Sequence, residues 1–292
     1  MNFSGQVAIV TGAGDGLGRA HALWLAKHGA SVVVNNRRQP DMPSSAQTVA
    51  AEITALGGRA IADDHAVDEP DAGKAMVKAA LDGFGRIDIV LCNAGITILE
   101  PFDQLDLQNF RKVVDVNLWG TVNAVHAAWP TMVKQRYGRI VLTTSTGGLY
   151  GVPNSTPYST SKASLIGFAR ALTFDVPEGS DIKINVLAPS AATKMLKGWV
   201  SDEMAAVLSP ERVATTAGWL ASKECDRSGI ILFAAAGRVT RVRIVESEPV
   251  EIVDDDFHVD WSTLDSTEHV TEASGVFESL AKLLPKSSGP AA

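Results

Sequence analysis

Short apolar runs rich in β-branched residues alternate with longer helical patterns through most of this chain of 292 residues. Runs that are apolar at almost every position are typical of strands buried on both faces, as in a parallel sheet covered by helices. The predicted strands are Gln6–Thr11, Ala30–Asn35, Arg59–Ala62, Ile87–Cys92, Arg139–Thr144, Ile182–Leu187 and Gly229–Ala234. The predicted helices are Leu17–His28, Ala46–Leu56, Ala72–Phe84, Asn109–Gln135 and Tyr158–Phe174. The alternation predicts an α/β fold with a doubly wound, seven-stranded parallel sheet and helices on both of its faces.

The pattern changes after Ala236, where the strand–helix alternation stops. We expect residues 1–236 to form one domain that includes the catalytic site. Residues 237–292 are too few for an independent core, so we expect a C-terminal extension that packs on this domain or on a partner subunit. The extension is predicted to contain a strand or extended arm at Val239–Val245, a solvated acidic loop at Asp254–Asp256, an amphipathic helix at Val270–Leu284 and a frayed, disordered tail at Ser287–Ala292.

Charge and cysteine content narrow the possible partners and compartment. Lys and Arg total 26 and Asp and Glu total 33, so the net charge of −7 argues against a basic footprint for nucleic acid. The two cysteines, Cys92 and Cys225, cannot form a disulfide framework and fit a reducing cytoplasm. No apolar stretch reaches the ~20 residues of a membrane span, and the short apolar run Val7–Val10 lacks the basic start of a signal peptide. The six histidines show no metal-ligand spacing. We therefore expect a cytoplasmic protein without nucleic-acid partner, membrane insertion or metal.

A glycine-rich turn joins the first predicted strand to the first predicted helix. It reads Thr11-Gly12-Ala13-Gly14-Asp15-Gly16-Leu17-Gly18. Glycines at such a turn let backbone N–H groups approach a pyrophosphate, and the helix N-terminus adds its positive dipole end. Leu17 falls where the plain G-x-G-x-x-G fingerprint has its third glycine, so the spacing is T-G-x-x-x-G-x-G. A tight turn without a ligand would also need glycines, but the strand before it and the helix after it favour dinucleotide binding.

The residues after the second predicted strand bear on which dinucleotide is bound. An acidic residue there accepts hydrogen bonds from the ribose hydroxyls of NAD, whereas arginine accommodates the 2′-phosphate of NADP. This chain has Asn36 at the acidic position and Arg37 next to it, which favours NADP slightly over NAD. Asp15 in the glycine turn argues the other way, because it would place negative charge near that phosphate. Arg37 and Arg38 also fit the alternative of two solvated loop cations.

Tyr158 and Lys162 are four residues apart and therefore share one face of a predicted helix. Thr156 as the cap and Pro157 in the first turn fit the start of that helix. A free phenol has a pKa of about 10, and a neighbouring ammonium lowers the pKa toward the range useful for proton transfer. A half-exposed tyrosine beside a lysine is the alternative interpretation of this pair.

Three upstream features favour the catalytic interpretation. Ser145 follows the fifth predicted strand, at the strand end where open α/β sheets bind ligands, and its hydroxyl could hold a substrate oxygen. Asn93-Ala94-Gly95 follows the fourth strand. Asn117 lies inside a long predicted helix, where asparagine is a poor helix former, and could hold a water in a proton relay.

Taken in order, these motifs identify the chain as similar to the short-chain dehydrogenase/reductase family. The matching residues are Thr11-Gly12-x-x-x-Gly16-x-Gly18, Asn93-Ala94-Gly95, Asn117, Ser145 and Tyr158-x-x-x-Lys162. The resemblance implies a Rossmann-like NAD(P)-binding domain over residues 1–236. It further implies that Tyr158 is the acid/base, Ser145 orients the substrate, Lys162 lowers the tyrosine pKa and binds the ribose, and Asn117 completes the relay.

Within that family the chain most resembles the (3R)-hydroxyacyl-CoA dehydrogenase domains of type 2 peroxisomal multifunctional enzymes. The segments that carry this resemblance include Val32–Asn35, Tyr137–Ile140, Gly148–Gly151 and Ser228–Arg238. The resemblance implies a 3-hydroxyacyl-CoA or a steroid-like hydrophobic alcohol as substrate. It also implies a homodimer or homotetramer, with Asn109–Gln135 and Tyr158–Phe174 as interface helices, although their apolar faces fit a core equally well.

The chain departs from the family pattern at several cofactor positions. The family's acidic residue is replaced by Asn36, and the aspartate that touches the adenine aligns near His65, with Asp64 beside it. The usual Pro-Gly is Pro189-Ser190, and Thr193, which would meet the nicotinamide amide, stands closer to Pro189 than usual. Lys194, Lys197 and Trp199 fall where the family places its substrate lid, and a loop with solvated lysines is the alternative.

These observations predict an NAD(P)-dependent oxidoreductase that interconverts a secondary alcohol and a ketone. The alternative is an NAD(P)-binding or redox-sensing scaffold protein without turnover. The complete set of Ser145, Tyr158 and Lys162 favours the enzyme.

Overall fold

The computed structural model describes residues 1–193, 201–250, 261–268, 270–272, 279–280 and 283. It divides into two compact units, Met1–Arg241 and Val242–Ala292. The first unit contains every element around the candidate site.

The first unit is built on one sheet, with the strand order β3-β2-β1-β4-β5-β6-β7-β8. The strands are β1 Val7–Val10, β2 Ser31–Asn35, β3 Arg59–Asp63, β4 Ile89–Cys92, β5 Tyr137–Thr143, β6 Asp181–Ser190, β7 Ile231–Ala235 and β8 Arg238–Val242. Each neighbouring pair from β3 to β7 is parallel. The order reverses between β1 and β4, and a crevice beside such a switch point is where doubly wound folds bind ligands. The predicted fold class is confirmed, with strand ends shifted by a few residues.

The prediction of seven strands is wrong, because the sheet has eight. Ala236 and Gly237 form the two-residue link from β7 to β8, with φ of 50° and 74°. Two consecutive positive φ values are typical of the tight turns that reverse a chain into an antiparallel hairpin. The alternation of residues 239–245 had predicted a strand or an arm, and its first part is this edge strand.

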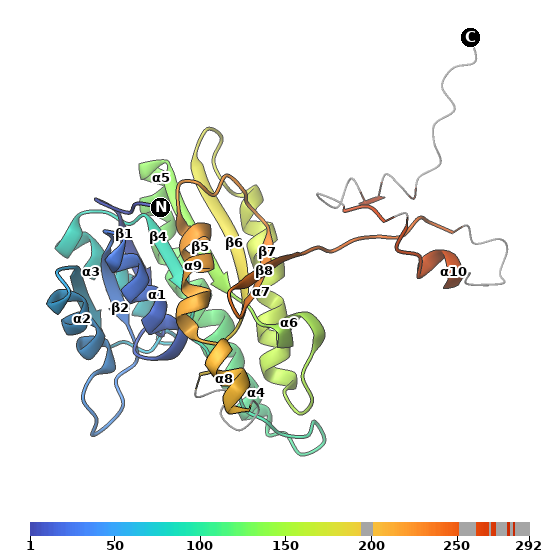
Figure 1. Ribbon diagram of the computed structural model, residues 1–292, viewed down its shortest axis with the longest axis horizontal. Coiled ribbons are helices and arrows are strands. Elements are labelled where there is room, and N and C mark those ends of the chain that lie inside the picture. The colour runs from blue at the N-terminus through green and yellow to red at the C-terminus, as the bar shows by residue number, and fades with distance from the viewer. Residues whose placement is uncertain (194–200, 251–260, 269, 273–278, 281–282, 284–292) are drawn as a thin grey trace, which may run out of the picture. The chain divides into compact units, whose positions relative to one another are not determined.

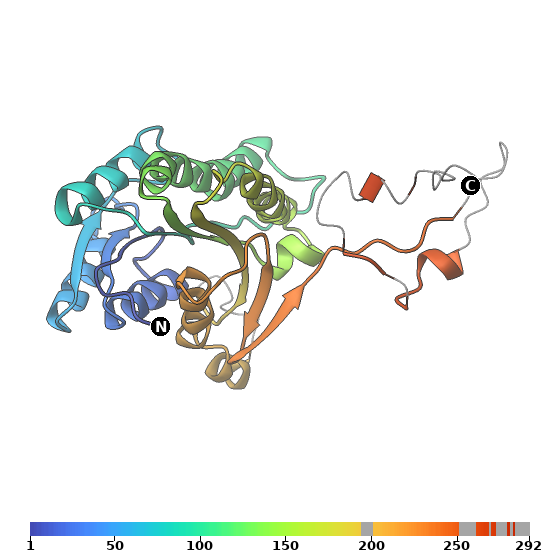
Figure 2. The same cartoon turned by 90° about the horizontal axis from the view of Figure 1, so that it is seen from above.

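Helices cover both faces of the sheet (Figures 1 and 2). The helices of the first unit are α1 Gly16–Lys27, α2 Ser45–Ala55, α3 Ala72–Phe84, α4 Leu107–Val114, the π-helix η1 Asp115–Trp119, α5 Gly120–Gln135, α6 Thr146–Tyr150, α7 Thr156–Phe174, α8 Asp202–Val207 and α9 Pro210–Ala221. A short helix, α10 Trp261–Leu264, belongs to the second unit. Helices α1, α2 and α9 lie on one face, and α3, α5 and α7 lie on the other.

The single helix predicted over Asn109–Gln135 is wrong, because the π-helix η1 interrupts it. Here the Thr121 hydroxyl donates to the backbone oxygen of Asn117, at 2.9 Å. A Cβ added to Gly120 would stand only 2.5 Å from Cγ2 of Val67, so glycine lets this turn approach the loop after β3. Single π turns occur often at functional sites.

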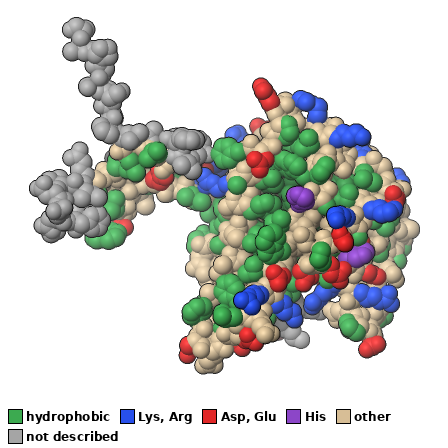
Figure 3. All heavy atoms as spheres, turned by 180° about the vertical axis from the view of Figure 1, so that it is seen from behind, with side chains coloured by type: hydrophobic (Ala, Val, Ile, Leu, Met, Phe, Trp, Pro, Cys, Tyr) green, Lys and Arg blue, Asp and Glu red, His purple; other side chains and the backbone are tan. Residues whose placement is uncertain are grey.

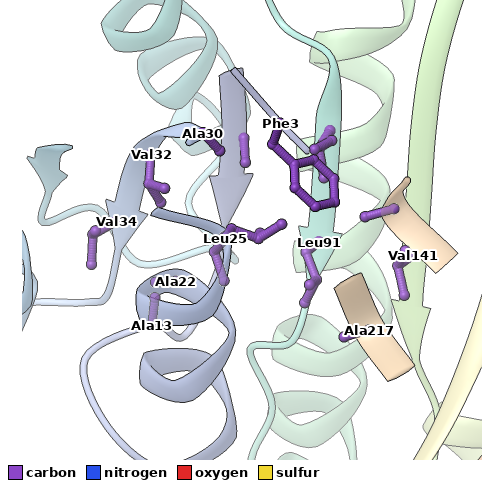
Figure 4. Close-up of a cluster of buried hydrophobic side chains, with 14 of the residues drawn as sticks. Phe3, Ala13, Ala22, Leu25, Ala30, Val32, Val34, Leu91, Val141 and Ala217 are labelled. Carbon is purple, nitrogen blue, oxygen red and sulfur yellow. The ribbon is translucent and has the colours of Figure 1, made fainter. Parts of the chain in front are cut away.

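The core lies between the sheet and the layer of α1 and α9 (Figure 4). Phe3 and Leu25 meet Val32, Leu91 and Val141 there, all at most 1% exposed. This packing fixes α1, and with it the glycine turn that precedes α1.

The second unit contains α10 and an antiparallel bridge between Glu246 and Thr271. Because Thr271 is in this bridge, the predicted helix does not begin at Val270. Most of that predicted helix, the acidic loop 254–256 and the tail 287–292 lie outside the described residues.

Candidate active site

The glycine turn packs tightly against its neighbours. Asp15 caps α1, and its side chain accepts a hydrogen bond from the Gly16 N–H at 2.8 Å. A Cβ on Gly18 would stand 2.1 Å from the Gly12 oxygen, and a Cβ on Gly12 would stand 2.7 Å from Cα of Ala94. Only glycine allows these approaches, so the turn keeps its backbone N–H groups close to the crevice.

Hydrogen bonds hold the ends of β1 and β4 together at this turn. The Thr11 hydroxyl accepts from the backbone N–H groups of Asn93 and Ala94, at 3.0 and 3.1 Å. The Asn93 side chain donates to the oxygens of Thr11 and Gly12, both at 3.2 Å. The predicted Asn93-Ala94-Gly95 motif therefore supports the shape of the turn from the neighbouring strand.

The end of β2 forms the next part of the crevice. The Asn36 amide donates to the Ser45 hydroxyl at 2.8 Å, directly above Gly14, where a Cβ would stand 2.3 Å from that hydroxyl. Arg37 is exposed and lines the same cavity as Asp15. The lining of this cavity thus contains side chains of opposite charge.

The loop after β3 is held by buried hydrogen bonds. Asp63 accepts from the Asn35 amide at 2.6 Å and pairs with Nδ1 of His65 at 2.9 Å. The hydrogen bond that His65 donates to the Asp63 carboxylate raises the pKa of His65 above its usual value, and burial opposes the shift. Asp64 instead bonds the Ser44 hydroxyl at the cap of α2. Among the described residues that line the cavity, this loop contributes Val67 and Asp68, whereas Asp64 and His65 do not line it.

The three candidate reacting side chains come from two neighbouring helices. Ser145 caps α6, accepts from the Gly147 N–H at 3.0 Å and hydrogen-bonds Tyr158 on α7. The structure places the cap of α7 at Ser155, one residue before the predicted Thr156. Lys162 is 3% exposed, and its ammonium donates to the backbone oxygen of Thr143 at 2.7 Å. The same ammonium nitrogen lies 6.0 Å from the centroid of the Tyr158 ring. The end of β5 therefore positions Ser145 and Lys162, and Ser145 in turn contacts Tyr158.

Burial dominates the pKa values of this site. Burial raises the pKa of Tyr158, and the hydrogen bond from Ser145 opposes that shift. Burial lowers the pKa of Lys162 to about 8, with a small opposing effect of Cys92. In this structure the phenol is thus held protonated, and the expected lowering of its pKa by Lys162 is not the dominant effect.

Asn117 lies in η1 and is completely buried. Its amide N–H groups donate to the Ile96 oxygen at 3.0 Å and to the Ser161 hydroxyl at 2.9 Å, and its Oδ1 accepts from the Ile96 N–H at 2.8 Å. A Cβ placed on Gly95 would lie 3.1 Å from Nζ of Lys162 and 3.2 Å from Oδ1 of Asn117. Since both amide N–H groups are donated to the protein, a relay through Asn117 would use an acceptor oxygen.

One cavity of about 330 Å³ runs from the glycine turn to the reacting side chains. The predicted residues that line it are Gly12, Asp15, Gly16, Leu17, Asn36, Arg37, Asn93, Ala94, Gly95, Ser145, Tyr158, Lys162, Pro189 and Thr193. Gly18 and Asn117 are buried behind this lining. The lining also contains residues that were not predicted as site residues, namely Asn35, Val67, Asp68, Ile96, Val116, Thr143, Thr144, Thr146, Ser190 and Ala191. Several of them lie at or just after strand ends and could have been suspected for that reason.

Thr193 lies against the glycine turn, because a Cβ on Gly16 would be 3.2 Å from its methyl group. Pro189 and Ser190 at the end of β6 also line the cavity. The predicted lid residues Lys194, Lys197 and Trp199 lie outside the described residues. Over the described part of the chain, no group of three or more His, Cys, Asp or Glu side chains could hold a metal ion. None of the helices described is long and apolar enough to cross a membrane.

Comparison with known proteins places the chain in a family. A family model described as short chain dehydrogenase matches residues 6–204. The chain therefore belongs to the short-chain dehydrogenase/reductase family.

Individual relatives agree with this assignment. The chain is 37% identical over 248 residues to the peroxisomal multifunctional enzyme type 2 of Mus musculus, covering 83% of this chain and 33% of that enzyme. It thus spans about a third of the length of that relative. The full-length structure of the Drosophila melanogaster enzyme matches with a TM-score of 0.81 at 29% identity, over 97% of this chain and 49% of that one. A 7α-hydroxysteroid dehydrogenase complexed with NADH and 7-oxo glycochenodeoxycholic acid matches with a TM-score of 0.73 at 31% identity, over 81% and 95%.

Proposed function

We propose that the protein interconverts a secondary alcohol and a ketone with NAD(P) as the cofactor. The observation that carries this proposal is a single cavity lined at one end by the glycine turn and at the other by Ser145, Tyr158 and Lys162. Glycines 12, 16 and 18, the capped start of α1 and the polar ends of β2 and β4 fit a dinucleotide.

A bound nicotinamide dinucleotide supplies the group that accepts or donates hydride. Tyr158 moves the proton at the substrate oxygen, and Ser145 donates a hydrogen bond that holds this oxygen beside the phenol. Because burial keeps the phenol protonated, Tyr158 is prepared to donate to a carbonyl oxygen. The Lys162 ammonium is placed to hold a ribose hydroxyl, and Asn117 with Gly95 shapes the wall behind it.

For the substrate, we propose a 3-hydroxyacyl-CoA or a steroid-like hydrophobic alcohol. Support comes from the similarity to the multifunctional enzymes and to the hydroxysteroid dehydrogenase. Ile96 and Val116 also give the cavity an apolar wall. Turnover of only small polar alcohols in a panel of hydroxyacyl-CoAs, sterols and short alcohols would contradict this substrate class.

For the cofactor, we propose a slight preference for NADP over NAD. Asn36 in place of an acidic residue, and Arg37 on the cavity, support it, whereas Asp15 on the same cavity opposes it. The test is the dissociation constant of each dinucleotide, measured separately on the apoprotein. Tighter binding of NAD would reject the preference.

Replacing Tyr158 by phenylalanine separates an enzyme from a binding protein without turnover. An enzyme should lose most of its kcat, by a factor on the order of 10² to 10⁴, because the general acid is removed. Its cofactor dissociation constant should stay within about twofold, because the ring remains in place. A wild-type protein that binds NAD(P) but turns over nothing in the panel would support the scaffold alternative.

We further propose that the protein is a homodimer or homotetramer and is cytoplasmic. Figure 3 shows hydrophobic side chains gathered on the face that carries α3, α5 and α7. Trp119 at 55% and Phe174 at 74% exposure belong to these predicted interface segments. Cys92 and Cys225 are both buried and unpaired, which fits a reducing compartment. Sedimentation and cell fractionation test the two statements, and the peroxisomal names of relatives make the peroxisome the location to compare.

A further inference from the structure

Ser161 lies in the turn of α7 that runs from Tyr158 to Lys162, but it does not line the cavity. It lies three residues after Tyr158 and one before Lys162, and it is 1% exposed. Its hydroxyl makes two hydrogen bonds. It donates to the backbone carbonyl oxygen of Tyr158 at 2.8 Å and accepts from the Asn117 side-chain amide at 2.9 Å.

A hydroxyl has one proton, so the direction of this chain of bonds is fixed. Asn117 donates to Ser161, and Ser161 donates to the backbone of Tyr158. The same Asn117 amide is attached to the loop after β4 through two bonds with Ile96. The Thr121 hydroxyl also fixes the backbone oxygen of Asn117, at 2.9 Å. Ser161 therefore connects the π-helix, and through Asn117 the loop after β4, to the turn of α7 that contains Tyr158 and Lys162.

We propose that Ser161 is a positioning residue for the reaction, acting through Asn117 to hold Tyr158 and Lys162 in register with the bound cofactor. The proposal rests on the proposed function, because it assigns Ser161 to that same site. The bond from Asn117 to Ser161, which we call the joint, links two elements, η1 and α7. An ordinary serine in a helix hydrogen-bonds only to the preceding turn of the same helix. A loss at this joint leaves a buried Asn117 N–H without a partner and frees the reacting turn to shift.

The chain supplies a matched control on the same helix. Ser164 also donates to the backbone oxygen three residues earlier, Ser161, at 2.7 Å. This bond stays within α7 and, unlike that of Ser161, does not involve Asn117. Comparing Ser161→Ala with Ser164→Ala therefore separates the joint from the loss of a local helix bond.

The experiment measures kcat, KM and the pH profile of kcat, together with the apoprotein melting temperature and the cofactor dissociation constant. Ser161→Ala should lower kcat about tenfold and shift the pH profile, with KM and the cofactor dissociation constant within about twofold. Ser164→Ala should leave kcat and its pH profile within about twofold of wild type. Equal effects of the two variants would overturn the proposal.

A double-mutant cycle with Asn117→Ala tests whether Ser161 acts through Asn117. In the Asn117→Ala background, Ser161→Ala should lower kcat by less than about twofold, because the joint is already broken. The unfolding free energies of the same four apoproteins should show the same non-additivity. The proposal would be overturned if the two substitutions acted independently. In that case the double variant would lose kcat by the product of the two single factors, and its loss of unfolding free energy would be the sum of the two single losses.

If Ser161→Ala does not fold, Ser161→Cys keeps the volume with a weak donor and is judged by the same criteria. Failure of the proposed function has a different signature, namely a folded wild type without turnover of any alcohol in the panel. In that case the unfolding cycle still decides whether Asn117 and Ser161 are coupled.

Discussion

Lys162 carries a charge at a place that water hardly reaches. It is 3% exposed, and the bond that the structure gives its ammonium is to a neutral carbonyl, that of Thr143. A buried ammonium without a carboxylate partner is costly, and this cost appears as the lowered pKa of about 8. The buried ammonium therefore lowers the stability of the apoprotein, a cost that the proposed role of Lys162 in the reaction would explain.

Lys162→Met should abolish turnover but stabilise the apoprotein at pH 7. A pKa of about 8 against 10.5 in the unfolded chain corresponds to roughly 3 kcal/mol of destabilisation of the wild type. This cost is fully present below pH 8, where both states are protonated. It disappears as the pH rises toward 10.5, because the folded state loses its proton first. Denaturant unfolding of both apoproteins at pH 7 and pH 10 should show a gain that shrinks with pH, and a constant or negative difference would contradict the assignment.

At the scale of elements, the site depends on the close approach of α6 to α7. Thr144 donates to the Lys162 backbone oxygen at 2.6 Å, which ties the end of β5 to α7. Gly148 faces this contact, because a Cβ there would stand 2.8 Å from the Cβ of Lys162 and 2.8 Å from the Thr144 hydroxyl. The helix that Ser145 caps can therefore lie against the helix of Tyr158 only with glycine at this position.

Gly148→Ala should push α6 away from α7 and separate Ser145 from Tyr158. We expect kcat to fall on the order of tenfold to a hundredfold and the unfolding free energy to fall by about 1–3 kcal/mol. Gly167→Ala is the control, since Gly167 is an exposed residue of α7 with nothing within 4 Å of its Cβ position. That control should gain up to about 1 kcal/mol of stability without loss of kcat. Equal kcat in the two variants would show that the approach of α6 does not matter.

The elements were largely predictable from the sequence, and the exceptions have physical reasons. Buried parallel strands are apolar throughout, so the seven parallel strands could be recognised, together with most of the helices between them. The helices α6, α8 and α9 were not predicted. The π-helix could not, because it depends on the Thr121 hydroxyl and on packing of Gly120 against Val67. The loop after β3 follows Asp63 and its bonds to Asn35 and His65, which brings Val67 and Asp68 to the cavity instead of Asp64 and His65. Long-range contacts of this kind leave no local pattern in the sequence.

At the scale of the whole molecule, His21 links stability to pH. It is 1% exposed on α1, and among the described residues neither of its ring nitrogens has a hydrogen-bond partner. Burial lowers the pKa of His21 to about 4. The imidazole is neutral in the folded protein at pH 7, and the unfolded chain takes up its proton first on acidification.

Replacing His21 by leucine should make the unfolding free energy depend less on pH between pH 7 and pH 4. Between pH 6.5 and about 4 the unfolded state binds the extra proton, so the wild type should lose roughly 3 kcal/mol to this group as the pH falls through that window. The His21→Leu variant lacks this contribution, while the carboxylates titrate alike in both proteins. Urea unfolding from pH 7 to pH 4 gives the difference, and parallel curves for the two proteins would reject the assignment to His21.

The two ends of the parallel strands differ, because in the part of the chain that the structure describes only the carboxyl ends line the cavity. The cavity is lined at the carboxyl ends of β1 to β6, while the turns before these strands line none of it within the described residues. Gly29, Gly57 and Gly85 have positive φ and lie in the turns before β2, β3 and β4, at the amino ends of the strands. A tether, label or crosslink introduced in these turns would leave the cavity open. Surface attachment of the protein and spectroscopic labels are therefore best placed at the amino ends of the strands.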